Sequence, residues 1–393
     1  MKFDIWKECP KVPLPSVLLT VVDNRGKTVP TAPSGHKLIA TNCVRNENLY
    51  PVYEKIRYLS EETYRTWFRA HPEPGDIIFV CKGTPGRVCL VPDPIDFCIA
   101  QDMVALRADP KIVYNKYLLA VLRSFQIQEQ ILSTSVGDVI PHFKKSFFDQ
   151  IMIPIPNMDI QKSIGDFYYT ISEKTELNKK INDNLEQQTA ALFSSLYNRS
   201  NTEVRYTDLI QILGGGTPKT GETAYWNGNI AFFTPKDVGT PYTFITEKTI
   251  TEEGLSHCNS RLYPVNTVFV TARGTVGKVG LSGVPMAMNQ SCYALVGKET
   301  HQLLVYFYTL KVVDRLKHKA SGSVFDAITT RDFESEQIMK LSDDDAKAFL
   351  CVAEPMFQEI LNNSIENLRL STLRDFLLPK FMSGEIDISN IQF

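Results

Sequence analysis

The sequence predicts an α+β fold with a pseudo-twofold internal repeat, in which two globular α/β domains are separated by two long antiparallel coiled-coil helices. Two observations support this prediction. FVCKGTPGRVCLV at residues 79–91 returns, with one extra residue, as FVTARGTVGKVGLS at residues 269–282. Each copy later continues into a segment of about 40 residues whose apolar residues repeat with helical spacing.

The repeat extends beyond these two stretches, because further similar segments flank both of them in the same order. The offset between matching segments drifts only between about 185 and 191 residues, so tandem duplication explains them better than coincidence. The matching segments are 25–30 with 214–219, 59–62 with 250–253, 100–101 with 289–290, 135–139 with 320–324, and Phe147 with Phe333.

The globular part of each copy, residues 1–156 and 201–341, is rich in β-branched and aromatic residues between glycine and proline turns. This pattern predicts short strands with a few helices. Residues 115–134 and 301–319 carry apolar residues with helical spacing, so we expect one helix there in each copy.

The long helices are expected within residues 157–200 and 342–393, the latter including a C-terminal tail. The first should cover residues 159–198 and the second residues 343–381, where Pro355 should kink the helix or make it restart. A helix of about 40 residues is roughly 60 Å long, and its apolar stripe would be exposed unless the two helices packed on each other. The stripe residues are Ile160, Ile164, Phe167, Ile171, Ile181, Leu185, Leu192 and Leu196 in the first helix, and Phe349, Ala353, Met356, Ile360, Ile365, Leu368 and Leu377 in the second.

Polar residues interrupt both stripes near the middle, Lys174 and Asn178 in the first helix and Asn363 and Asn367 in the second. Two interpretations are open. These residues are either solvated positions on an imperfect seam or polar layers that set the register of the helices.

Composition places the chain among soluble globular proteins, with 43% apolar and 22% charged residues. The eight cysteines have neither C-x-x-C spacing nor histidine partners at metal-ligand spacing, which favours reduced thiols over disulfides or zinc. Early prolines interrupt any signal peptide and no apolar run reaches the length of a membrane span, so we expect a cytoplasmic protein. The net charge is −2 and the pI about 6.3, so any surface for nucleic acid has to be local.

Sequence motifs of catalysis are missing, and no catalytic residue, cofactor or metal site is predicted. Residues 25–28 contain the Gly-Lys-Thr of a phosphate-binding loop, but Val21 stands where its first glycine should be. The glycines of residues 274–280 are spaced by three, unlike those of a dinucleotide-binding turn. No nucleophile elbow, zinc-protease motif or Asn-Pro-Pro-aromatic methyltransferase signature occurs, and the six histidines form no cluster in the sequence. A catalytic pair of acidic residues that are distant in sequence is the one possibility that stays open.

Recurring polar residues indicate recognition instead. Lys82 and Arg87 flank the first Gly-Thr-x-Gly turn, and Arg273 and Lys278 flank the second. Long cations beside a glycine turn can reach phosphates or guanine edges, and amides can pair with adenine. The alternative is that Gly-Thr-x-Gly is only a hairpin turn required by the fold, with solvated cations around it. The side-chain amides that follow the glycine turn are Gln101 in the first copy, and Asn289 and Gln290 in the second.

Several of these elements together resemble the specificity subunit of type I restriction–modification systems over essentially the full chain. In the second copy the similar elements are residues 214–218, 225–230, 234–237 and 273–277; in the first they are 23–28, 74–76, 83–86 and 153–156 leading into Gln161 and Ile164. The first copy lacks the triple glycine and the Tyr-Trp-x-Gly element. The second has residues 338–341 in place of Ile-Pro-x-Pro.

The resemblance implies that residues 1–156 and 201–341 are target recognition domains, each reading one half of a bipartite site in double-stranded DNA, and that the helix pair sets the spacer. It implies no catalysis by this chain: DNA methyltransferase (modification) subunits packed on the helices would methylate adenine, and a restriction/motor subunit would cleave. A subunit of a related two-component restriction enzyme and a protein scaffold that binds no DNA are the alternatives. The candidate DNA-binding residues are Arg25, Lys27, Lys82, Arg87, Gln101, Lys219, Lys236, Arg273, Thr275, Lys278 and Gln290.

Overall fold

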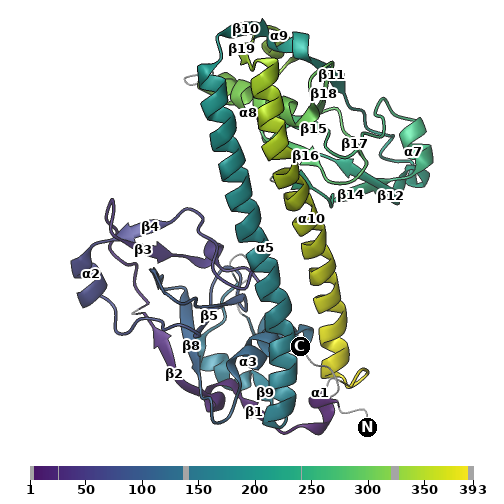
Figure 1. Cartoon of the computed structure of the whole chain (residues 1–393). Coiled ribbons are helices and arrows are strands. Elements are labelled where there is room, and N and C mark those ends of the chain that lie inside the picture. The colour runs from purple at the N-terminus through teal and green to yellow at the C-terminus, as the bar shows by residue number, and fades with distance from the viewer. Residues whose placement is uncertain (1–3, 25, 136–140, 240, 320–326, 388–393) are drawn as a thin grey trace. The chain divides into compact units, whose positions relative to one another are not determined.

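A computed structural model of the chain describes residues 4–24, 26–135, 141–239, 241–319 and 327–387. The chain divides into two compact units. Unit 1 comprises Met1–Asn178 with Glu366–Phe393, and unit 2 comprises Lys179–Ile365. The boundary falls within two long helices, α5 (Met158–Arg199) and α10 (Asp343–Met382), so each unit contains part of both (Figure 1).

Before α5, the described residues of unit 1 form nine short strands and a few short helices. Its strands are β1 (Lys11–Pro13), β2 (Leu18–Asp23), β3 (His36–Ile39), β4 (Arg57–Leu59), β5 (Ile77–Val80), β6 (Val88–Leu90), β7 (Phe97–Ile99), β8 (Met103–Ala108) and β9 (Met152–Pro154). Its short helices are α1 (Ile5–Glu8), α2 (Glu61–Thr66), α3 (Asn115–Leu122) and α4 (Phe125–Thr134), with 3-10 turns η1 (Leu14–Val17), η2 (Thr41–Cys43) and η3 (Lys145–Gln150).

The strands of unit 1 form three sheets in the orders β2-β8-β5-β6, β4-β3-β7 and β1-β9. All neighbours in the first sheet are antiparallel, whereas β3 and β7 are parallel. Side chains alternate along β5, as the period of a strand requires. Ile77 and Phe79 pack toward α3 and α5, while Ile78 and Val80 pack against the three-stranded sheet.

Unit 2 repeats this plan. Its strands are β10 (Thr202–Arg205), β11 (Ile210–Gly214), β12 (Trp226–Phe233), β13 (Tyr242–Thr243), β14 (Lys248–Ile250), β15 (Val268–Thr271), β16 (Val279–Ser282), β17 (Met286–Met288), β18 (Cys292–Gly297) and β19 (Gln337–Lys340). Its shorter helices are α6 (Tyr206–Leu209), α7 (Glu252–Ser256), α8 (Gln302–Lys319) and α9 (Thr330–Glu334), with the 3-10 turn η4 (Thr223–Tyr225).

The sheets of unit 2 have the orders β11-β18-β15-β16-β13, β14-β12-β17 and β10-β19. Apart from the added β13, each sheet has a counterpart in unit 1, down to the parallel pair β12–β17. Local caps repeat as well: Ser60 and Thr251 each follow a strand and cap the next helix through the side-chain oxygen. The repeat predicted from sequence is therefore a repeat of topology. The matched segments 135–139 and 320–324 lie mostly outside the described residues.

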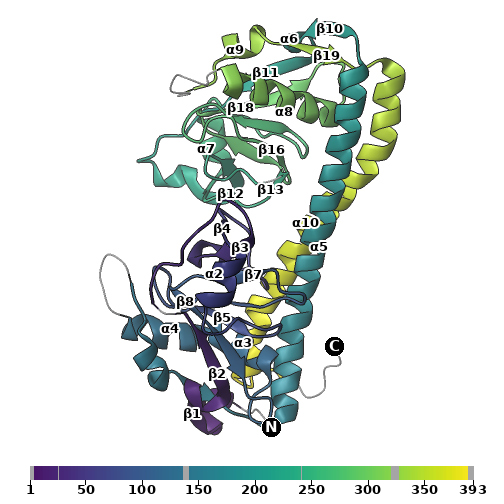
Figure 2. The same ribbon diagram turned by 90° about the vertical axis from the view of Figure 1, so that its left-hand side faces the viewer.

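In each unit the two long helices run antiparallel and join the core of the globular part (Figure 2). Phe167 of α5 packs edge-on against Phe381 of α10 in unit 1, with ring centroids 4.8 Å apart. In unit 2, Phe193 of α5 contacts Phe349 of α10 and Phe307 of α8, with centroids 5.5 and 5.1 Å away. Both helices are therefore held by side chains of the globular domains as well as by each other.

Two expectations about helices were wrong, and a third was wrong in part. The expected single helix over residues 115–134 is two helices, because Ser124 lies outside the helical conformation and its hydroxyl caps α4 at Ile127. Pro355 does not make α10 restart, because the helix is continuous over Asp343–Met382, and a kink at Pro355 stays a prediction. Pro355 and Cys351, whose carbonyl loses a helical hydrogen bond, are both exposed, so water can satisfy that carbonyl. Ile181 is 45% exposed and does not belong to the buried seam.

The polar residues of the seam form layers that are bonded across the two helices. In unit 1, Asn178 is fully buried and donates to Glu366 (2.6 Å) and Asn367 (3.0 Å). In unit 2, Asn363 donates to Asn182 at 3.0 Å. The interpretation of solvated positions is thus wrong for Asn178 and Asn363, which are buried. Asn367 is half-buried and belongs to the same bonded layer as Asn178, whereas Lys174 is half-exposed and pairs with Glu366 at 3.4 Å.

Candidate nucleic-acid interface

The two Gly-Thr-x-Gly turns connect equivalent strands, β5 to β6 and β15 to β16. Both glycines of each turn have positive φ, between +76° and +88°, a region that other residues rarely adopt. The glycines are therefore required by the hairpin itself. The cations beside them are not explained by the hairpin, because the side chains of Lys82, Arg87, Arg273 and Lys278 have no hydrogen bond or ion pair to another described residue.

Sheet topology brings candidates from distant parts of each copy to one edge. In unit 1, β2 and β5 are both antiparallel to β8, so their carboxyl ends meet the start of β8: Asp23 pairs with Val104, and Val80 with Met103. Lys27 follows β2, Lys82 follows β5 and Gln101 precedes β8. This edge is called edge 1 below.

Unit 2 has the same arrangement. The carboxyl ends of β11 and β15 meet the start of β18, where Gly214 pairs with Tyr293 and Thr271 with Cys292. Lys219 and Arg273 follow these strands, and Gln290 precedes β18. This edge is called edge 2. Lys82 and Arg273 also form equivalent isolated backbone bridges, with His142 and Ala327.

At edge 2 a groove of about 490 Å³ collects several of the candidates. Thr275 donates its hydroxyl to the carbonyl of Pro235 at 2.8 Å, which ties the glycine turn to the segment after β12. Lys236 is 79% exposed and forms an ion pair with Glu247 at 3.5 Å. The lining residues are Thr234, Pro235, Lys236, Glu247, Lys248, Arg273, Gly274, Thr275, Asn289 and Ser291.

Other candidates lie outside this groove. Lys278 and Lys219 are exposed but are not among its lining residues. Gln290 is exposed, and its side-chain oxygen accepts a hydrogen bond from Thr217. At edge 1, the amide oxygen of Gln101 is buried without a hydrogen-bond partner among the described residues, and Arg25 lies outside the described residues.

Four charged residues at the two edges were not selected from sequence. Lys144 and Lys145 begin the η3 region, and Lys145 forms an ion pair with Asp23 at edge 1. A pair of adjacent lysines after His142 was a usable signal. Glu247 and Lys248 line the groove of edge 2, where the Lys248 ammonium lies 5.6 Å from the ring centroid of Trp226; nothing in the local sequence marks these two.

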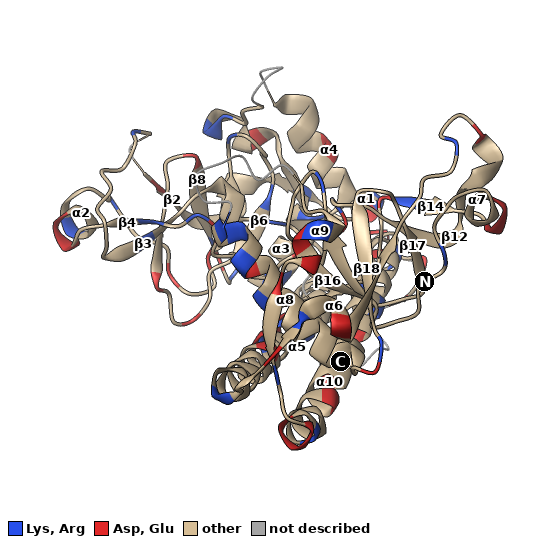
Figure 3. Ribbon diagram, turned by 90° about the horizontal axis from the view of Figure 1, so that it is seen from above, with Lys and Arg blue, Asp and Glu red and all other residues tan. Residues whose placement is uncertain are grey.

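The charge of the chain is mixed along its length, with lysine and arginine interspersed with aspartate and glutamate (Figure 3). Local cations at edges 1 and 2 are therefore a feature of those edges and not of the whole protein. Among the described residues no cluster of three or more His, Cys, Asp or Glu side chains could hold a metal ion. The helices within the described part of the chain include none that is both long and apolar enough to span a bilayer.

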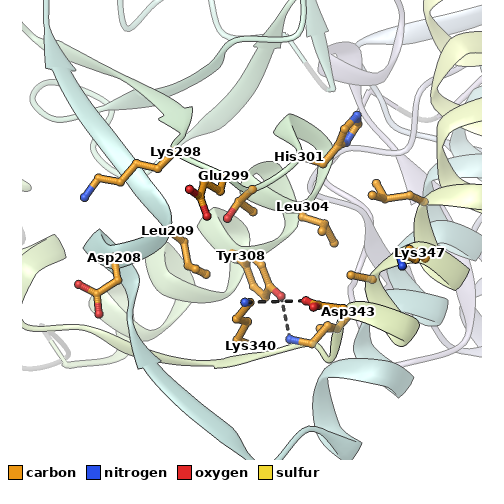
Figure 4. A pocket seen from close by; sticks show the side chains of 14 residues that line it. Asp208, Leu209, Lys298, Glu299, His301, Leu304, Tyr308, Lys340, Asp343 and Lys347 are labelled. Carbon is orange, nitrogen blue, oxygen red and sulfur yellow. Dashed lines mark hydrogen bonds and ion pairs between the residues drawn. The ribbon is translucent and has the colours of Figure 1, made fainter.

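A larger cavity of about 640 Å³ lies elsewhere in unit 2, between α8, β19 and the start of α10 (Figure 4). Leu209, Leu304 and Leu350 give it an apolar part, and the Tyr308 hydroxyl accepts a hydrogen bond from the Leu341 amide at 2.9 Å. Lysines and acids alternate around it, as in the Lys340–Asp343 pair at 4.0 Å. It has no excess of one charge that would favour an anion.

Comparison with known proteins gives the family. The family described as "Type I restriction modification DNA specificity domain" matches twice in tandem, over residues 32–187 and 198–340. The HindI specificity subunit of Haemophilus influenzae is 23% identical over 398 aligned residues, covering 79% of this chain and 86% of that protein. The EcoR124I/EcoR124II specificity subunit of Escherichia coli is 29% identical over 46% of this chain and 49% of that protein.

A solved structure supports the same fold. The S subunit of a type I restriction–modification system from M. genitalium aligns over 97% of this chain and 98% of its own length, with a TM-score of 0.62 at 16% identity. The tandem match covers most of the chain, and the duplicated topology with two long helices accounts for it. The chain therefore belongs to the family of type I restriction–modification DNA specificity subunits.

Proposed function

We propose that each globular part of this specificity subunit is a target recognition domain, the first within residues 1–156 and the second within 201–341. Each reads one half of a bipartite site in double-stranded DNA. The observation that carries the proposal is the convergence of cations and amides around a glycine turn at equivalent sheet edges, where Lys82 and Arg273 have no side-chain partner among the described residues. Base edges are read by such groups, and phosphates by exposed lysine and arginine.

The two halves of the site should differ in sequence. Edge 2 has a triple glycine before Thr217 and a groove lined by Lys236, Lys248 and Arg273, whereas edge 1 presents Lys27, Lys82 and a buried Gln101 amide. Different side chains at equivalent positions present different hydrogen-bond donors and acceptors to the DNA. The long helices, residues 157–200 and 342–393, set the spacing between the halves.

This chain recognises and does not catalyse; methylation and cleavage belong to partner subunits. The helix α10 offers a surface for the modification subunit, a groove of about 380 Å³ that includes Leu373 and Phe376, which are 46% and 60% exposed. An apolar groove exposed on a charged helix is typical of a protein interface. The partner subunits also supply phosphate contacts, which a chain of net charge −2 needs.

The first test of this function is spacer dependence. The complex assembled with modification subunits should bind a bipartite duplex and lose affinity when one or two base pairs are added to its spacer. Equal binding at every spacer length would favour the protein scaffold. Methylation profiling of DNA from cells that express the chain with its partners identifies the site to be used.

Arg273→Ala tests edge 2 directly. The guanidinium is exposed and unpaired among the described residues, so the change should leave the unfolding temperature within about 2 °C while it weakens specific binding by roughly tenfold. Binding titrations at several salt concentrations measure this, and Arg205→Ala on β10, also exposed, is the control. Unchanged affinity for Arg273→Ala would remove that residue from the contact surface.

A further inference from the structure

Glu247 is an acidic side chain in the groove of edge 2, among the cations Lys236, Lys248 and Arg273. A carboxylate in a surface that approaches DNA is repelled by phosphate, so its presence there needs a reason. One explanation is that it only pairs with Lys236, 3.5 Å away. That pair is exposed on both sides, with 79% and 56% of the side chains accessible, and exposed pairs contribute little to stability.

Hydrogen bonds fix the backbone around Glu247, although an exposed ion pair with Lys236 would not need a fixed backbone. The amide of Glu247 donates to Oδ1 of Asp237 at 2.7 Å, while Oδ2 of Asp237 accepts from the amide and hydroxyl of Thr234. Next to it, the Thr246 hydroxyl accepts from the amide of Phe232 at 3.1 Å and donates to the carbonyl of Lys248 at 2.7 Å. Residues 246–248 are thus tied to both ends of the turn after β12.

The two carboxylates of this region therefore have different tasks. Asp237 uses both oxygens to hold backbone and side-chain groups. Glu247 accepts no hydrogen bond from a backbone group of the described residues, and it lines the groove together with Thr275 and Asn289. A rigid support that carries an exposed carboxylate, held only by the ion pair with Lys236, is the arrangement of a recognition residue.

The chemistry of base edges selects the ligand for such a carboxylate. In the major groove it accepts from an exocyclic amino group. The amino group of adenine lies beside the N7 acceptor, which repels a carboxylate, whereas the amino group of cytosine has no acceptor on that side within its own base. Resting on the proposed function of edge 2, we propose that Glu247 reads the N4 amino group of a cytosine in the second half-site.

The test is the methylated sequence motif of the assembled complex with Glu247→Gln. A neutral amide of the same length keeps the groove filled but accepts more weakly and can also donate. One C·G position in the half-site assigned to unit 2 should relax, with discrimination falling by about tenfold, while the other half-site and the spacer stay unchanged. Glu252→Gln on α7 makes the same charge change outside the groove and should leave the motif intact.

Three results would overturn the inference. The motif of Glu247→Gln could be unchanged, or the relaxed position could be an A·T pair, or the variant could bind all duplexes more tightly without a change of preference, as loss of a repulsive charge predicts. Arg273→Ala separates this failure from failure of the whole site. If Arg273→Ala weakens binding and Glu247→Gln leaves the motif intact, edge 2 contacts DNA and only the cytosine assignment is wrong; if neither has an effect, edge 2 is not the interface.

Discussion

The two units share their strands but differ where the globular part meets the start of a long helix. In unit 1, Gln161 is 1% exposed, and its amide accepts from Tyr114 N (2.9 Å) and donates to the carbonyls of Ile112 (3.2 Å) and Pro156 (3.0 Å). Gln161 is the seventh residue after the end of β9, and Lys347 is the seventh residue after the end of β19. Lys347 is exposed and lines the cavity of Figure 4. The same junction is closed in one copy and open in the other.

A glycine completes the closed junction. A Cβ on Gly165 would lie 2.6 Å from the backbone nitrogen of Tyr117 and 2.9 Å from a ring carbon of Tyr114, so α5 approaches α3 as closely as backbone allows. The position eleven residues after β19 is Cys351, which is exposed. The two copies thus share the strand order, but only unit 1 has the buried glutamine and the glycine that close this junction onto its helix.

The largest expected effect comes from filling the space at Gly165. Alanine in a helix is ordinarily favourable by about 1 kcal/mol over glycine, but here its methyl group has no room, and overpacking should destabilise unit 1 by about 3 kcal/mol. Hydrogen exchange of amides in α3 and β8 measures the loss. Cys351→Ala in unit 2 is the matched change and should have no comparable effect; equal stability of Gly165→Ala would mean that α3 and α5 can separate freely.

Gln161→Ala should have the next largest effect, about 2 kcal/mol. The change leaves one backbone amide and two carbonyls without their hydrogen-bond partner. Because these groups are shielded from water in the folded protein, water does not fully replace that partner. Lys347→Ala, at the equivalent distance from its strand, removes an exposed side chain and should change stability by less than about 0.5 kcal/mol. Urea unfolding measures the stability of both variants, and hydrogen exchange of backbone amides shows which unit is destabilised. Similar losses in the two variants would contradict the contrast between a closed and an open junction.

The polar layer of the helix seam in unit 2 should have the next smaller effect. Asn182→Leu leaves the donor of Asn363 unpaired at a position only 6% exposed, so it should cost about 1–2 kcal/mol. Adding Asn363→Leu removes that donor too and should restore stability to within about 0.5 kcal/mol of the parent, because paired apolar residues suit a seam. A double-mutant cycle by thermal unfolding measures the coupling. Additive losses would show that the two amides are solvated independently.

Much of the fold could be predicted because its signals are periodic. The apolar stripes locate α5 and α10 to within one residue at each end, at Met158–Arg199 against the predicted 159–198 and Asp343–Met382 against 343–381. Periodicity alone could not show that Ile181 lies in a stretch where the seam is polar and its side chain turns to solvent. It also missed Ser124, since one hydroxyl cap ends a helix without disturbing the apolar spacing around it.

The candidate site was harder to predict because it depends on which strand ends meet. Lys82 and Arg273 were found through the repeated glycine turn, which is local. Glu247 enters the groove on a backbone that Asp237, ten residues earlier, holds by a hydrogen bond, and the Lys248 ammonium lies over the ring of Trp226. Contacts of that kind leave no pattern in a single sequence. The boundaries of the two recognition domains remain predictions.

Thiol reactivity gives the smallest expected difference between the units. Burial raises the pKa of Cys81, Cys89 and Cys98 in unit 1, and of Cys292 in unit 2, to about 12. Because the thiolate is the reactive form, and a raised pKa lowers its population at neutral pH, these four should react slowly. Cys351 is exposed, so a maleimide should label unit 2 first, at that residue. Peptide mapping after brief labelling checks this: early modification of a unit 1 cysteine would show that its sheets open more readily than their burial implies, and Cys351→Ser should abolish the fast phase.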